Sequence, residues 1–231
     1  SPINQKSMQK SILITGASGN LGHAVLQKFV NEGFKVYGTD RSASPRTDAE
    51  IGAVDLTDEQ ATQAYIEDIC KKSPNLNAAV LLVGGYAPGG LKAADGAALQ
   101  KMYQLNFETA YFVVHALLPH FEANGGGHIV LIGSRAAIDA QAALYNVAYG
   151  LSKSLLIALA NIINAYGKNK GIRASVIIPS TIDTPPNREA MPDADFEKWT
   201  TPEAIADSIH FLFTEPGQHL RETVLKLYNE A

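Results

Sequence analysis

Short apolar runs alternate with longer segments of helical periodicity along most of the chain. Seven of the apolar runs have the length of β-strands, and they cover residues 11–15, 35–39, 53–55, 78–83, 128–133, 172–178 and 223–228. Helical patterns fill the intervals, and the two longest cover residues 96–121 and 142–166. The continuously apolar run at 78–83 is typical of a strand buried on both faces of a parallel sheet. This alternation predicts a single doubly wound α/β domain, in which a seven-stranded parallel sheet has helices on both faces.

The first predicted strand ends in a glycine-rich turn. Gly16, Gly19 and Gly22 follow it at three-residue intervals, and a helical pattern continues to Glu32. Glycines let the backbone approach a phosphate, and a helix N-terminus supplies free N–H groups and a partial positive charge. The spacing G-x-x-G-x-x-G differs from the G-x-G-x-x-G of dinucleotide-binding turns, but the context favours nucleotide binding over a turn without a ligand. The expected contacts are Gly16, Ser18, Gly19, Asn20, Leu21 and Gly22.

Two acidic residues at strand ends are candidates for contacts with the adenosine part of a nucleotide. Asp40 lies 18 residues after Gly22, near the offset of about 20 residues at which a carboxylate bonds the ribose hydroxyls. Its charge favours NAD, whereas the adjacent Arg41 could attract the additional phosphate of NADP, so we expect NAD with NADP possible. A turn residue is the alternative for Asp40. Asp55, followed by Leu56, is placed to accept a hydrogen bond from adenine or to cap the strand end.

The predicted helix at residues 142–166 contains the candidate chemistry. Tyr149 and Lys153 are four residues apart, so their side chains share one face of a helix. A phenol has a pKa of about 10, and a fixed cation nearby lowers that pKa and prepares the tyrosine for acid–base work. A buried tyrosine beside a lysine that extends to solvent is the alternative interpretation of this pair.

Further candidates follow the other predicted strands, because open α/β sheets bind ligands beyond the carboxyl ends of their strands. Gly84 and Gly85 follow one strand, and Ser134 follows the next. Asn106 lies within the helical segment 96–121, where a polar amide needs a bonding partner. A proline-bounded loop follows the sixth strand, and the polar segment from there to Thr200 reads as a lid or substrate loop. The cofactor contacts expected from this loop are Pro179, Ile182 and Thr184.

Composition narrows the class of protein. The 231 residues suit one large α/β domain, and the net charge of −4, without a basic block, argues against nucleic acid or an anionic membrane as a partner. No run of 18 uninterrupted apolar residues predicts a membrane span. The single Cys70 fits a reducing, cytoplasmic location. The six histidines lack metal-site spacing. We expect residues 1–10 to be a flexible segment, with a natural start at Met8, and residues 11–231 to form the catalytic domain.

Taken together, these residues resemble the short-chain dehydrogenase/reductase family from Met8 onward. Within that family the sequence is similar to the dihydropteridine reductase branch, most clearly in the stretch from Asp183 to Phe196. That branch has alanine where Ser134 stands, and the 15-residue gap from Ser134 to Tyr149 is two residues longer than the family's usual spacing. Either Ser134 is displaced, or the loop from Asp139 to Asn146 absorbs the difference.

The resemblance implies a Rossmann fold and hydride transfer between a nicotinamide and a carbonyl, an alcohol or a quinonoid dihydropterin. It implies that Tyr149 is the general acid or base and that Lys153 lowers its pKa and bonds the nicotinamide ribose. Ser134 would hold the substrate oxygen, and Asn106 would order a water. A homodimer or homotetramer is implied through the two long helices. A dinucleotide-binding regulator without catalysis is the alternative, and the presence of Tyr149, Lys153 and Asn106 counts against it.

Overall fold

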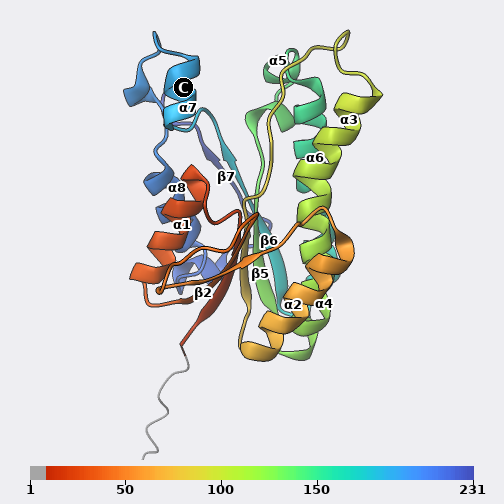
Figure 1. Cartoon of the computed structure of the whole chain (residues 1–231), viewed down its shortest axis with the longest axis vertical. Coiled ribbons are helices and arrows are strands. Elements are labelled where there is room, and N and C mark those ends of the chain that lie inside the picture. Colours follow the sequence, from red (N-terminus) through yellow and green to blue (C-terminus); the bar gives the residue numbers. More distant parts are fainter. Residues whose placement is uncertain (1–8) are drawn as a thin grey trace, which may run out of the picture.

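The computed structural model describes residues 9–231, and its centre is one parallel sheet in the order β3-β2-β1-β4-β5-β6-β7 (Figure 1). The predicted seven-stranded parallel sheet is therefore confirmed. β1 and the two strands that follow it in the sheet, β4 and β5, are buried along their whole length, which explains their continuously apolar sequences. The strands are β1 (Ser11–Thr15), β2 (Lys35–Asp40), β3 (Glu50–Ala53), β4 (Ala78–Leu81), β5 (Gly127–Ile132), β6 (Ile172–Pro179) and β7 (Val224–Leu227).

Helices cover both faces of this sheet (Figure 1). On one face α1 (Asn20–Asn31) packs against α8 (Pro202–Phe211), and Phe29 lies at the centre of their apolar cluster. On the other face lie α2 (Glu59–Lys72), α4 (Thr109–Ala123) and α6 (Val147–Gly167), which share a second cluster that includes Leu117 and Phe121. Both clusters bury large side chains completely, so each face has its own hydrophobic core.

The long helix predicted at residues 96–121 contains a wider turn. α3 (Gly96–Tyr103) passes into a π-helical segment, Gln104–Glu108, before α4 begins. Asn106 lies in this segment and is completely buried. Periodicity could not reveal the extra residue, because a single π-turn shifts the apolar pattern by only one position.

The helix predicted at residues 142–166 is interrupted. α5 (Ala140–Ala143) ends before Tyr145, and α6 begins at Val147. The interruption arises because the loop after β4 bonds the backbone here: Gly89 N–H donates to the Tyr145 carbonyl, and Val147 N–H donates to the Gly89 carbonyl. Tyr149 is therefore in the first turn of α6.

α6 is long and apolar enough to cross a membrane on length and composition alone. In this structure its apolar side contributes Leu156, Leu159 and Ile163 to the core beneath the sheet. A core helix of a folded domain passes the same test of length and composition, and the buried side chains assign α6 that role here.

Smaller differences from the sequence prediction concern element boundaries. β3 ends at Ala53, so Asp55 follows the strand instead of ending it. β4 ends at Leu81, which leaves Val83 in the loop. Of the expected flexible segment, residues 1–8 lie outside the described part of the chain. Gln9 is bonded to the domain, since its carbonyl accepts a hydrogen bond from the Asn75 amide at 2.7 Å.

The strand order reverses between β1 and β4, which both pair with their neighbours in parallel register. The chain leaves β1 toward one face and leaves β4 toward the other, so the carboxyl ends of these two strands are flanked by diverging loops. In open α/β sheets this switch point is where ligands bind.

Candidate active site

The glycine turn after β1 is built around one close backbone contact. Gly16 has a positive φ of 70°, and a side-chain carbon on Gly22 would lie 1.9 Å from the Gly16 carbonyl oxygen. Only glycine fits at Gly22, because that distance is far below van der Waals contact. The backbone of α1 is thereby held directly against the end of β1.

The N-terminus of α1 has no side chain that caps it or neutralises its partial positive charge. Its N-cap is Gly19, no side chain caps it, and no acidic residue lies in its first turn. α2 provides a contrast, because Asp58 caps its first turn and Glu59 lies within it. The free N–H groups and partial positive charge of α1 therefore remain available to an anion, and this chemistry fits a phosphate group.

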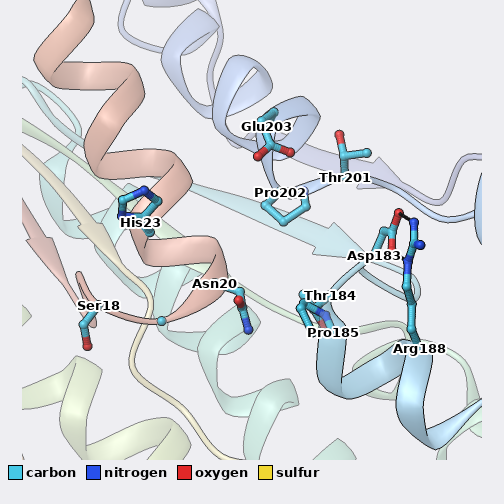
Figure 2. A pocket seen from close by; sticks show the side chains of 11 residues that line it. Ser18, Asn20, His23, Asp183, Thr184, Pro185, Arg188, Thr201, Pro202 and Glu203 are labelled. Carbon is cyan, nitrogen blue, oxygen red and sulfur yellow. Dashed lines mark hydrogen bonds and ion pairs between the residues drawn. The ribbon is translucent and has the colours of Figure 1, made fainter.

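Two cavities adjoin this turn and share Ser18 and Gly19. One, of about 660 Å³, extends past Asp40 toward the loops after β3 and β4. The other, of about 600 Å³, lies between α1 and the segment after β6. Figure 2 shows the second cavity, with Asn20 at the start of α1 facing Thr184 across it.

The first cavity gathers the residues that the sequence assigns to adenosine. It is lined by Asp40, Arg41, Asp55, Leu56 and Gly84, among others. The Asp55 carboxylate accepts hydrogen bonds from the Thr57 hydroxyl at 2.6 Å and the Thr57 N–H at 3.0 Å. These bonds stabilise the charged form and lower the pKa of Asp55. Asp55 thus acts as a turn cap, and it also remains on the cavity wall.

The wall of the second cavity includes part of the segment that resembles the dihydropteridine reductase branch. Thr184 caps the short helix α7 (Pro185–Ala190), and Asn187 donates a hydrogen bond to the Ile182 carbonyl at 2.8 Å. Arg188 pairs with both carboxylate oxygens of Asp183, at 2.6 and 2.9 Å. The run from Asp183 to Arg188 therefore folds as one self-bonded unit. Pro179 ends β6 beneath it.

Ser134 and Tyr149 come together beyond the carboxyl end of β5. Burial of the phenol raises the pKa of Tyr149 above its usual value, and the nearby Ser134 side chain lowers it by a smaller amount. Desolvation of the charged phenolate thus outweighs the favourable contact with Ser134. The lowering expected from Lys153 stays a prediction. The contact with Ser134 also means that the loop from Asp139 to Asn146 absorbs the longer gap.

Lys153 lies one helical turn further along α6 and is 8% exposed. Its ammonium donates a hydrogen bond to the Ile132 carbonyl at 3.0 Å, and burial lowers its pKa to about 8. No ion pair in residues 9–231 includes Lys153. A buried ammonium without a carboxylate partner retains donor capacity for polar groups of a ligand.

Gly84 connects this lysine to the first cavity. A side-chain carbon on Gly84 would lie 2.6 Å from the Asn106 amide oxygen and 3.4 Å from the Lys153 nitrogen. The next residue is clamped by Asn106, whose oxygen accepts from Gly85 N–H at 2.8 Å and whose nitrogen donates to the Gly85 carbonyl at 2.9 Å. Both ends of the Asn106 amide thus position the glycine loop. The expectation that this side chain orders a water stays untested.

The sequence profile of the short chain dehydrogenases matches residues 10–195. The chain belongs to this family. A dihydropteridine reductase from Dictyostelium discoideum is 30% identical over 208 residues, which cover 87% of each chain. The 2,3-dihydro-2,3-dihydroxybenzoate dehydrogenase of Escherichia coli is 24% identical, over 91% of this chain and 92% of that protein.

Solved structures share the fold of this short-chain dehydrogenase. ElxO with NADP bound superposes with a TM-score of 0.87 at 24% identity, covering 95% of this chain and 97% of that one. The ligand-free aldohexose dehydrogenase of Thermoplasma acidophilum gives 0.85 at 23% identity, covering 96% and 94%. Among residues 9–231 no group of three His, Cys, Asp or Glu side chains could hold a metal ion.

One residue of the short-chain dehydrogenase site was missed by the sequence reasoning. Tyr86 is 63% exposed, and its ring meets that of Tyr149 edge-to-face at 5.1 Å. Its hydroxyl donates to the Asn146 side chain at 2.5 Å. An aromatic residue next to Gly84 and Gly85 was the only signal in the sequence. Tyr86 therefore forms one wall beside the candidate acid.

Replacing Asn106 with alanine is expected to destabilise the protein by about 2–4 kcal/mol, because three hydrogen bonds of roughly 1 kcal/mol each are lost and their buried partners stay unpaired. The third of these bonds joins the Asn106 amide to the Ser152 hydroxyl at 3.0 Å. Urea unfolding measures the change. Ser152→Ala, which removes only that third bond from Asn106, is the matched control and should cost less than half as much. Equal losses in the two variants would contradict the clamp.

Proposed function

We propose that the protein is an NADH-dependent reductase that transfers hydride to a quinonoid dihydropterin or a related cyclic carbonyl compound. One observation supports this most directly. The buried Lys153 lies beside Gly84, which lines the cavity that begins at the glycine turn, and Tyr149 precedes Lys153 by one turn of α6, with Ser134 nearby. A candidate proton donor and a cation thus lie close to the wall of the cavity that begins at a phosphate-compatible turn.

The chain's own residues have separable tasks in this proposal. The glycine turn and the α1 N-terminus bind the pyrophosphate, and Lys153 bonds the hydroxyls of the adjoining ribose. The bound nicotinamide supplies the hydride. Ser134 bonds the oxygen or nitrogen that becomes negative, and Tyr149 donates the proton that completes the reduction. Positioned proton transfer of this kind contributes on the order of 10²–10⁴ in rate.

The raised pKa of Tyr149 suits a proton donor. Burial keeps the phenol protonated across the neutral range, so it is poised to give a proton and less ready to accept one. Lys153 is charged at neutral pH with its pKa near 8, and its charge would favour the phenolate that remains after transfer. This protonation state matches the proton-donating role that the proposed reductase assigns to Tyr149.

The pterin substrate class is favoured by the relatives and by one segment of the chain. The dihydropteridine reductase of Dictyostelium discoideum is 30% identical, and the unit from Asp183 to Arg188 borders the second cavity. The exposed ring of Tyr86 beside Tyr149 offers a flat aromatic wall against which a planar heterocycle can stack.

The test is to follow NADH and NADPH oxidation with quinonoid dihydropterin beside a panel of aldehydes, ketones and hydroxysteroids. The proposal expects the pterin to give the highest kcat/KM. Faster turnover of a simple carbonyl would overturn the pterin assignment and leave the reductase assignment standing. No turnover with any substrate, together with tight cofactor binding, would favour a regulator without catalysis.

The choice of NADH depends on Asp40 at the end of β2. Asp40→Ala is expected to reduce the preference for NADH over NADPH by about tenfold, equivalent to roughly 1.4 kcal/mol, because a carboxylate repels the 2′-phosphate of NADPH. Fluorescence titration with both cofactors measures the ratio. Asp55→Asn, on the same cavity wall, is the control and should change both affinities alike. An unaltered ratio in Asp40→Ala would show that Asp40 does not contact the ribose.

A further inference from the structure

A third cavity, called the rear cavity below, lies at the opposite end of the strands from the candidate active site. It has a volume of about 350 Å³ and is bordered by the amino-terminal ends of β4, β5 and β6. Its floor includes Gly125 and Gly126, whose φ angles of 88° and 125° are positive. A side-chain carbon on Gly126 would lie 2.2 Å from the Gly171 carbonyl. Backbone, with no intervening side chain, therefore forms this part of the wall.

The charges around this rear cavity are all positive. Lys10, Arg173 and Arg221 line it, and no aspartate or glutamate does. Arg173 donates to the carbonyls of Gln218 and Leu220, and these bonds leave its charge unneutralised. No ion pair within residues 9–231 includes either arginine. The pKa of Arg173 is lowered by burial and by the nearby charge of Arg221, as expected for two cations without a counter-ion.

A buried histidine in the same wall has an unused polar atom. His128 is 6% exposed, and its Nε2 is 2.7 Å from the Ser175 hydroxyl. Its Nδ1 has no hydrogen-bonding partner among the described residues. Burial and the two arginines lower the pKa of His128 to about 3, so the ring is neutral. The Nδ1 atom is itself enclosed, so this ring, which lines the cavity, serves as a reporter of its surroundings.

We propose that the rear cavity binds a small oxyanion, a phosphate or carboxylate group, between Arg173 and Arg221. Guanidinium groups donate to pairs of oxygen atoms on such anions, and both arginines line this cavity. The site is separate from the glycine turn, because the two lie at opposite ends of the parallel strands. It is independent of the proposed reductase activity.

The test is a titration with inorganic pyrophosphate and, separately, citrate, at constant ionic strength set with sodium chloride. The nitrogen and carbon-bound proton signals of the His128 ring are followed by NMR, because they report on this cavity and not on the glycine turn. Both probes, or one of them, should shift these signals in a saturable way. Saturation by pyrophosphate alone would assign phosphate groups, and saturation by citrate alone would assign carboxylates.

Two variants that remove the same charge make the result specific. Arg221→Gln is expected to weaken binding at least about tenfold, since a charge-assisted bond is lost. Lys226→Gln, an exposed cation outside the cavity, should bind as the unaltered protein does. Thermal unfolding without ligand verifies that both variants fold. The proposal is overturned if the His128 signals do not respond, or if both variants respond like the unaltered protein.

Discussion

Replacing Tyr149 with phenylalanine is expected to lower kcat by a factor on the order of 10²–10⁴ and to leave cofactor affinity close to that of the unaltered protein. The substitution removes one hydroxyl and keeps the ring, so the edge-to-face contact with Tyr86 at 5.1 Å is preserved. What disappears is the phenolic hydroxyl near Ser134, and with it the proton that the proposed mechanism requires. A phenylalanine there can bind and orient a substrate without completing its reduction.

Single-turnover and steady-state kinetics measure this loss, and fluorescence titration measures the cofactor affinity. Tyr145→Phe is the matched control, since Tyr145 is 76% exposed and lies four residues before Tyr149 in the sequence. It should retain full turnover. A Tyr149→Phe enzyme that is as active as the control would refute the assigned role of the phenol, and loss of cofactor binding would point to a misfolded site instead.

The order of elements and the candidate residues were predictable because they depend on local patterns. Apolar runs of strand length predicted the sheet, and the resulting topology brings the ends of β1, β4 and β5 to one edge. Gly16, Asp40 and Gly84 line one cavity because each lies at or just beyond the carboxyl end of one of the parallel strands. The position of each residue relative to a strand end was therefore enough to predict that the three residues lie close together.

The electrostatic state of Tyr149 was not predictable from the sequence, because burial depends on contacts between distant segments. The spacing of Tyr149 and Lys153 predicts a shared helix face, and it says nothing about how much water reaches the phenol. In the folded protein desolvation determines the direction of the pKa. Proximity to a cation and exclusion of water act in opposite directions, and only the three-dimensional arrangement decides between them.

The role of Asn106 illustrates a second kind of limit. The sequence indicates that a buried amide needs partners, but a π-helical turn and a loop 21 residues away determine which ones. The same holds for the interruption before α6, which exists because Gly89 bonds the backbone on both sides of Asn146. Non-local backbone bonds of this type leave almost no periodic signal.

The proposed cofactor binding depends on the glycine turn, and Gly22→Ala is expected to damage this turn severely. Helix propensity alone predicts that alanine at this position in α1 stabilises the protein by up to about 1 kcal/mol. The new carbon, however, would lie 1.9 Å from the Gly16 oxygen and 2.9 Å from the Gly16 carbonyl carbon. Both are backbone atoms that cannot turn aside, so the turn must open. Overpacking of this kind costs roughly 1–3 kcal/mol or more, which outweighs the gain.

Gly19→Ala provides the matched control and separates folding from binding. A side-chain carbon on Gly19 would lie 3.8 Å from the Gly16 oxygen, an ordinary contact, and its φ of −66° suits any residue. Its stability should stay near that of the unaltered protein, whereas each kcal/mol lost in Gly22→Ala lowers Tm by roughly 2–4 °C. Both cavities include Gly19 in their walls, so an added methyl there should weaken cofactor binding without unfolding the turn. Unchanged cofactor affinity in Gly19→Ala would mean that the pyrophosphate does not approach this turn, and the proposed orientation of the cofactor would have to be abandoned.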